Sequence, residues 1–349
     1  MNPYLDRCIS VIDHHLTQIE PKMKWMWGEA LFGYALLCLD EYLGETKYKT
    51  FIEGYLDYYL QNPPVVDQSD KFAPVLISFT YGRIYQTNTY DSLTQLGLDY
   101  IENVKPVIDF LPNHLGHSFI GKLYPKSIWV DSIMMYGVFL SVYGHHHKSQ
   151  KYQLMAYNTA IKFKEYLEKD GLWRHAYWVK FKRAYPKDIY WGRGNGWVVT
   201  ALPMMMEHLD TVYQMPLKDL AIKTIQAITP LQKNHLYTTV LNHPSGVESS
   251  ANFLIHGGVL HTSQLTVIDE AYTKLAKKGY EIAMDTFVKP KEGHLYLTKV
   301  SNPTIPLPLF PLLGYKLIGH KDNWSYGLAS LIFSSIHYDK LRIKEEKDV

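Results

Sequence analysis

A glycine-rich segment at 190–197, Tyr-Trp-Gly-Arg-Gly-Asn-Gly-Trp, places one arginine between glycines. Glycine adopts backbone angles that other residues disfavour and lets a ligand approach the chain closely. Asn195 is a typical N-cap, which predicts that a helix begins directly after it. Arg193 and the free N–H groups of that helix would then suit a carboxylate or a phosphate, with Trp191 and Trp197 as walls. The alternative is a tight turn in which Arg193 pairs with a nearby acid.

A second candidate is Asp131, which continues an apolar stripe of helical spacing through Met135, Val138 and Val142. A carboxyl group on an apolar face is desolvated, and desolvation raises its pKa because the charged form is disfavoured. A general acid that works near neutral pH needs such a carboxyl group. Asp131 also fits an N-cap at the start of the same helix, so the residues alone leave both interpretations open.

Two further residues have a structural and a functional interpretation. Asp70 precedes an apolar helix, where it or Ser69 would cap the N-terminus, or where it would be a second active-site carboxylate. His175 follows an Asp170-Gly171 turn and lies among tryptophan and tyrosine residues. A loop histidine in such surroundings suits hydrogen bonding to a sugar hydroxyl, although it is also compatible with a histidine that has a purely structural partner.

The sequence lacks the common metal and nucleotide motifs. The run 145–147 contains three histidines, but three adjacent residues cannot share one face of a helix, so we interpret it as a solvated helix end. The G-x-G-x-G spacing at 192–196 differs from the dinucleotide-binding pattern. We therefore expect no metal and no cofactor. Cys8 and Cys38 both fall in apolar helical patterns, which predicts buried thiols and a reducing, cytoplasmic environment.

The composition predicts a folded protein with a substantial core. Of 349 residues, 46% are hydrophobic and 20% are charged, which excludes intrinsic disorder. The net charge of +2 offers no basis for binding nucleic acid or an anionic membrane surface. No apolar run approaches the roughly 20 residues of a membrane span, and the first residues do not resemble a signal peptide. Aromatic residues, at 14%, are plentiful enough to stack on sugar rings.

The dominant hydrophobic period along the chain is helical. Breaks at glycine, proline and asparagine predict twelve helices, which we place at 3–19, 26–43, 46–61, 69–86, 91–105, 129–144, 149–169, 196–210, 216–231, 248–262, 265–287 and 325–339. Long connections at 106–128, 170–195, 232–247 and 288–324 contain short alternating runs typical of small strands. We expect one all-α domain over 1–349, in which six helical hairpins form either a toroid of inner and outer helices or an open solenoid.

Taken together, four segments resemble the unsaturated rhamnogalacturonyl hydrolases of glycoside hydrolase family 105, which are related to the unsaturated glucuronyl hydrolases of family 88. They are Ile-Trp-Val-Asp at 128–131, Gly-Leu-Trp-Arg-His-Ala at 171–176, Trp-Gly-Arg-Gly-Asn-Gly-Trp at 191–197 and Glu-Ser-Ser-Ala at 248–251. The resemblance extends over residues 25–335. It implies an (α/α)6 barrel with short strands in its long loops.

The resemblance also implies an activity, the release of a 4,5-unsaturated uronic acid from the non-reducing end of oligosaccharides that polysaccharide lyases produce. Asp131 would protonate C4, and water would add at C5 with Asp131 now acting as the base. The hemiketal would open and the aglycone would leave. The rule that relates carboxylate separation to retention or inversion does not apply to this hydration.

Position by position, the resemblance assigns Asp70 as the other active-site aspartate. Residues implied to bind substrate are His175, Trp191, Arg193, Asn195 and Trp197, with Trp25 or Trp27 and Glu29 near the first inner helix. The family often carries a His-Lys pair shortly before the catalytic aspartate. This chain has Ile120-Gly121 at the ungapped position, which leaves His117 and Lys122 as candidates for that function.

Two other functions are compatible with the same helices. A sugar 2-epimerase would use paired histidines as bases, for which His175, His208 and His256 are available. A non-catalytic protein would bind glycans without changing a bond. For the hydrolase we expect an unsaturated oligosaccharide as substrate, no nucleic acid or membrane partner, and a monomer or dimer.

Overall fold

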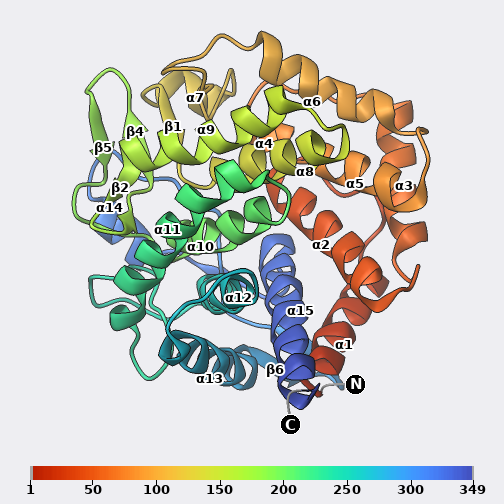
Figure 1. Cartoon of the computed structure of the whole chain (residues 1–349), viewed down its shortest axis with the longest axis vertical. Helices are drawn as coiled ribbons and strands as arrows, with labels where there is room; N and C mark the ends of the chain where they lie inside the picture. The colour runs from red at the N-terminus through yellow and green to blue at the C-terminus, as the bar shows by residue number, and fades with distance from the viewer. Residues whose placement is uncertain (1–2, 348–349) are drawn as a thin grey trace.

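The computed structural model describes residues 3–347 and is predominantly helical, as predicted. Twelve helices of nine or more residues occur in this range (Figure 1). They are α1 (Pro3–Thr17), α2 (Trp27–Leu43), α3 (Lys49–Gln61), α5 (Val75–Tyr85), α6 (Asp91–Asn103), α8 (Val138–His146), α9 (Gln150–Leu167), α10 (Gly192–Met206), α11 (Thr211–Ile228), α12 (Ser249–Leu265), α13 (Glu270–Phe287) and α15 (Ser325–Lys347).

These helices form two concentric rings. Each helix of the inner ring contacts the next, in the order α2, α5, α8, α10, α12, α15 and back to α2. The outer helices α1, α3, α6, α9, α11 and α13 alternate with them along the chain, and Figure 1 shows them at the periphery. Since contacts between α15 and α2 close the ring, the fold is an (α/α)6 barrel. The open solenoid, the other predicted arrangement, is therefore wrong.

The inner ring is buried because its helices are apolar or small on all sides. Every residue of α10 is buried, as is nearly all of α12. Outer helices such as α13 instead have one apolar stripe and one charged face, as expected of helices that cover a core. Glycine lets the inner helices approach closely: a Cβ added to Gly258 of α12 would lie 2.4 Å from the Val199 carbonyl oxygen of α10.

Short elements lie between the long helices, and most of the strands fall in the long connections, as predicted. The helical ones are α4 (Ser69–Phe72), α7 (Phe119–Leu123), α14 (Pro311–Lys316), the π-helix η1 (Ile133–Gly137) and the 3-10 helix η2 (Thr229–Leu231). The strands are β1 (Ser127–Trp129), β2 (Glu168–Lys169), β3 (Leu172–Trp173), β4 (Ala176–Trp178), β5 (Arg183–Tyr185), β6 (Val288–Lys291), β7 (His294–Leu297), β8 (Val300–Ser301) and β9 (His320–Lys321). They pair antiparallel as β1-β4-β5, β2-β3, β6-β7 and β8-β9.

Several predicted helix boundaries are wrong. Helix α11 begins at Thr211 instead of 216, α13 begins at Glu270 instead of 265, and α15 extends to Lys347 instead of 339. Three other helices differ for a local reason. The helix predicted at 69–86 is two helices, because α4 ends before Pro74 and α5 begins after it. The helix predicted at 129–144 starts later, because Trp129 pairs in strand β1 and the next two residues form a turn. Helix α10 begins at Gly192 with Trp191 as its N-cap, so Asn195 lies inside the helix and does not cap it.

No helix within residues 3–347 combines the length and the apolar character that crossing a bilayer requires. Both cysteines are free thiols; Cys8 is buried and Cys38 partly so.

Candidate active site

A cavity of about 350 Å3 lies among the N-terminal ends of the inner helices, and we call it the N-end cavity. Trp27 comes from the start of α2, Arg193 from the start of α10 and Tyr326 from the start of α15. Asp70 and Asp131 lie on the segments that precede α5 and α8. Because backbone N–H groups at helix starts carry partial positive charge, this end of the barrel favours an anionic ligand.

Asp131 lies in the turn between β1 and η1, which corrects its predicted place within a helix. Pairing of β1 with β4 positions this turn, and Val130 N donates to His175 O at 2.8 Å. The Asp131 side chain is 10% exposed, and its Oδ1 has no hydrogen-bond partner within residues 3–347. Burial raises the pKa of Asp131 to about 7, against smaller opposing effects of backbone N–H groups and Arg193. A raised pKa of this kind is what a general acid that works near neutral pH requires.

Asp70 lies on the short helix α4, next to Ser69, whose hydroxyl accepts a 2.7 Å hydrogen bond from Tyr136. Burial and the negative charge of Asp131 raise the pKa of Asp70 to about 8. Gln68, and neither Ser69 nor Asp70, is the N-cap of α4, and no side-chain capping bond is formed there. The capping interpretation is thus wrong for Asp70, which faces the N-end cavity with Asp131.

Arg193 also lines the N-end cavity, and it is fully buried. Its guanidinium donates to Ser301 O at 2.8 Å and to Asn302 O at 3.0 Å, and it lies 4.7 Å from the ring centroids of both Trp191 and Tyr326. Within residues 3–347 it forms no ion pair, so the predicted alternative of pairing with an acid is wrong. A buried cation without an acidic partner is strongly attracted to an anionic group of a ligand.

Trp27 and Trp191 are walls of the N-end cavity, and Glu29 also lines it. Trp27 stacks on Tyr326 with ring centroids 4.6 Å apart. Trp25, the alternative to Trp27, instead donates from its indole to Lys71 O at 2.8 Å and is not among the lining residues. The N-end cavity therefore has aromatic faces and polar groups together, as sugar-binding sites do.

Three residues predicted to bind substrate, His175, Asn195 and Trp197, do not line the N-end cavity. The ring of His175 stacks on Trp191 at 4.2 Å and bonds to the Tyr315 hydroxyl at 2.7 Å. Asn195 bridges to the backbone of Trp173 and Trp191, with bonds of 2.8–2.9 Å.

Trp197 packs edge-on against Trp27, with centroids 6.2 Å apart. These three side chains are buried, so they support the wall of the cavity from behind.

Sequence reasoning missed His114, which lines the N-end cavity between the two carboxyl groups. Its Nε2 lies 3.5 Å from Asp70 Oδ1, and its Nδ1 lies 4.0 Å from Asp131 Oδ1. The connection 106–128 contains no periodic pattern that would single out His114. The only signal is that this histidine directly follows the turn-forming residues Pro112 and Asn113. The candidates named in its place are elsewhere, because His117 and Lys122 line a different surface pocket, while Ile120 does line the cavity.

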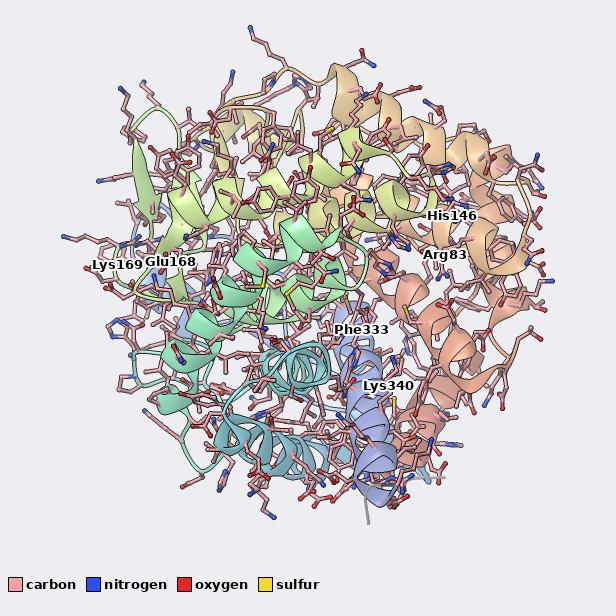
Figure 2. The ribbon with its side chains drawn as sticks, in the orientation of Figure 1. Arg83, His146, Glu168, Lys169, Phe333 and Lys340 are labelled. Carbon is pink, nitrogen blue, oxygen red and sulfur yellow. The ribbon has the colours of Figure 1, made fainter. Side chains whose placement is uncertain are left out.

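A second cavity, of about 570 Å3, lies toward the C-terminal ends of the inner helices, and we call it the C-end cavity. Arg83, Phe333 and Lys340, labelled in Figure 2, line it together with His208. His175 and His256 lie elsewhere, His256 with its Nε2 3.0 Å from His235 O. The three histidines proposed for a 2-epimerase are thus not brought together at one site. At the helix opening 248–251, Glu248 caps α12 by accepting from Ala251 N at 2.7 Å.

The fold and this pair of buried carboxyl groups are those of a glycoside hydrolase. The family model of glycosyl hydrolase family 88 matches residues 5–342, and the chain belongs to this family. The resemblance seen in the sequence is thereby confirmed.

Individual relatives are distant. The unsaturated rhamnogalacturonyl hydrolase YesR of Bacillus subtilis (strain 168) is 24% identical over 229 residues. This match spans 63% of this chain and 63% of YesR, which is a little under two thirds of the length of that relative. A family 105 glycoside hydrolase of C. acetobutylicum ATCC 824 has a TM-score of 0.83 at 20% identity, covering 97% of this chain and 100% of that one. The unsaturated glucuronyl hydrolase of Bacillus sp. GL1 has a TM-score of 0.75 at 14% identity, covering 95% of both chains. At these identities the solved structures support the barrel fold alone.

Proposed function

We propose that this chain is a hydrolase of the unsaturated rhamnogalacturonyl or glucuronyl type. It releases a 4,5-unsaturated uronic acid from the non-reducing end of oligosaccharides that lyases generate. The observation that carries the proposal is a buried carboxyl group with a raised pKa, Asp131, in a cavity that is also lined by a buried cation without an acidic partner, Arg193. Family membership and the name of the curated relative support the same activity.

The chemistry follows from these two groups. Asp131 transfers its proton to C4 of the double bond, and positive charge develops at C5 and the ring oxygen. The Asp131 carboxylate formed by this transfer stabilises that charge and then takes a proton from the water that attacks C5. The new C5 hemiketal opens by breaking the bond from C5 to the ring oxygen. The hemiacetal left at C1 then releases the aglycone alcohol.

Substrate binding uses the remaining walls of the N-end cavity. Arg193 attracts the uronate carboxylate, because its charge is not neutralised by an acid of the protein. Trp27 and Trp191 offer rings to the apolar faces of the sugar, and Glu29 and Gln68 offer hydrogen-bond partners for hydroxyl groups. No metal or cofactor takes part in any step.

We further place the enzyme in the cytoplasm, acting on small imported lyase products as a single catalytic domain over residues 1–349. The free thiols Cys8 and Cys38 support a reducing environment. The state in solution is a monomer or dimer, which sedimentation would decide.

The experiment follows the ultraviolet absorbance of the C4=C5 double bond. The protein is incubated with unsaturated disaccharides from pectin, rhamnogalacturonan and glycosaminoglycan lyases, and loss of absorbance is expected with at least one of them. Saturated disaccharides of the same composition serve as the control and should remain intact. Constant absorbance with every unsaturated substrate would exclude the activity.

A further inference from the structure

His114 is held rigidly against both carboxyl-bearing segments of the N-end cavity. Its backbone N–H donates to Ser127 O at 2.9 Å, next to β1, and its carbonyl accepts from Ser69 N at 3.1 Å, next to Asp70. The ring stacks on Trp129 with centroids 4.3 Å apart and an interplanar angle of 13°. Only 2% of the residue is exposed. The direction in which each ring nitrogen points is therefore determined by the fold.

The partners of the two ring nitrogens couple the tautomer of His114 to the charge of Asp70. Nδ1 lies 2.8 Å from the hydroxyl oxygen of Ser132, which is able to donate or to accept. If Ser132 donates to Nδ1, the ring proton is on Nε2 and faces Asp70 Oδ1 at 3.5 Å, which favours an ionised Asp70. If Nδ1 carries the proton, the Nε2 lone pair faces the same oxygen and favours a protonated Asp70.

The N-end cavity needs this coupling because its carboxyl groups compete for a proton. Burial raises the pKa of Asp131 to about 7, and burial with the charge of Asp131 raises the pKa of Asp70 to about 8. Because burial favours the neutral form of both groups, the two carboxyl groups compete for a proton, and the proposed reaction requires that proton on Asp131. The other charged or titratable groups around the pair are Arg193 and Tyr315 near Asp131, Tyr100 and Tyr136 near Asp70, and Lys24 and Glu29 on the cavity wall. Burial lowers the pKa of His114 itself to about 3, so the ring stays neutral.

We infer that His114 is a positioning residue which, with Ser132 donating to its Nδ1, keeps Asp70 ionised and so holds the proton on Asp131. An ionised Asp70 also disfavours a second negative charge on Asp131, which keeps Asp131 protonated to higher pH. The free Oδ1 of Asp131 then carries or accepts a proton without competing bonds from the protein. The kinetic consequence of this inference rests on the proposed function. The distribution of the proton between Asp70 and Asp131, by contrast, is a property of the enzyme without substrate.

The kinetic test compares His114→Phe, which preserves the stack on Trp129 but lacks both nitrogens, with the wild type. In His114→Phe, the alkaline limb of the plot of kcat against pH should shift by about one unit to lower pH. Near pH 5.5, where both carboxyl groups are protonated, kcat should return to within about threefold of the wild type. A merely structural function of His114 would lower kcat at all pH values. His114→Gln, whose amide again offers an N–H, should move the limb back, and Ser132→Ala should shift it partway in the same direction as His114→Phe.

His117→Phe is the matched control, since this exposed histidine lies three residues away and outside the N-end cavity. Its profile should match that of the wild type. Unchanged near-ultraviolet circular dichroism checks the fold of each variant. An alkaline limb that stays in place in both His114→Phe and Ser132→Ala would overturn the inference.

A second measurement separates this inference from the proposed function. Carboxyl-¹³C NMR of aspartate-labelled resting enzyme, assigned with Asp70→Asn and Asp131→Asn, gives the order in which the two groups ionise. Asp70 should ionise at lower pH than Asp131 in the wild type, and the order should reverse in His114→Phe. If Asp70 retains its proton longer in the wild type, the inference is wrong even where the enzyme turns over its substrate. If the enzyme turns over no substrate, the order in which Asp70 and Asp131 ionise still tests the inference about His114.

Discussion

At the scale of single residues, burial changes the chemistry of the N-end cavity more than direct contacts do. Desolvation is the largest cause of the raised pKa of both Asp70 and Asp131 and of the lowered pKa of His114. Arg193 lies in the same surroundings without an acidic partner. Burial thus favours the neutral forms of Asp70, Asp131 and His114, and it leaves Arg193 as a cation that can bind an anion.

Asp131→Asn should lower kcat about 10²–10⁴-fold, because the amide cannot supply a proton to C4. It should also raise the free energy of unfolding at pH 8 by roughly 1–4 kcal/mol. The folded-state pKa of Asp131 is raised to about 7, so the folded protein binds more protons than the unfolded chain, and stability falls as pH rises from about 4 through 7. At pH 4 the gain should vanish.

Urea titrations at pH 4 and pH 8, together with absorbance assays, measure both effects of this substitution. Asp170→Asn at an exposed turn is the control, and neither property should change. Near-normal turnover by Asp131→Asn would show that another residue is the general acid.

Arg193→Gln should raise KM for the unsaturated disaccharide about 10- to 100-fold, because a charge-assisted hydrogen bond to the uronate is lost. The methyl ester of the same substrate supplies the control, since it has no carboxylate for Arg193 to recognise. The variant should therefore bind the acid and the ester about equally, whereas the wild type prefers the acid. If Arg193→Gln still prefers the free acid over the methyl ester as strongly as the wild type does, another group binds the carboxylate.

At the scale of elements, the inner helices position the site by bringing their N-terminal ends together. Helices α10 and α12 pack backbone to backbone, and Thr200 Oγ1 donates to Leu254 O at 2.9 Å across this contact. The start of α10 is fixed in turn by Asn195, which bridges to the chain at Trp173. Arg193 and Trp191 are thereby held on a part of the barrel that has little freedom to adjust.

Gly258→Ala should destabilise the protein by roughly 1–3 kcal/mol, because its Cβ would lie 2.4 Å from a carbonyl oxygen of α10. The matched control is Gly246→Ala, at which an added Cβ meets nothing within 4 Å. Its effect should stay within about 0.5 kcal/mol. Thermal and urea unfolding measure both. Equal losses in the two variants would mean that the close approach of α10 and α12 does not limit stability.

At the scale of the whole molecule, the apolar interior contains histidines that must stay uncharged. Burial lowers the pKa of His114 and His256 to about 3 and that of His175 and His337 well below its usual range. They are spread over the connections and inner helices and are nearly inaccessible to solvent. The free energy of unfolding of the whole protein therefore depends on pH.

Acid should unfold the protein cooperatively, with a midpoint below about pH 4. Below about pH 6.5 the unfolded chain protonates these four histidines while the folded protein does not, so stability falls as pH falls, by up to about 1.4 kcal/mol per unit for each. Asp70 and Asp131 act in the opposite direction but are only two groups. Far-ultraviolet circular dichroism from pH 8 to pH 3 measures the transition. A fold that persists unchanged at pH 3 would contradict this prediction.

Local patterns in the sequence determined the helical class and the number of long helices, since amphipathic periodicity and helix breakers act over a few neighbouring residues. Asp131 is buried as predicted, but in a turn that the helical pattern did not indicate. The glycine-rich motif likewise indicated Arg193, Trp191 and a helix start. The same local patterns misplaced Asn195 as a cap and left His114 unnoticed.

Only the tertiary structure decided which side chains face the N-end cavity. His175, Asn195 and Trp197 carry the polar and aromatic groups of a binding site, yet they lie behind its wall, while His114 from an aperiodic loop lies on it. The reason is that the cavity forms where the ends of six helices, far apart in the chain, close into a ring. Whether a residue faces the cavity or the packing behind it depends on contacts with the other helices, which no local pattern records.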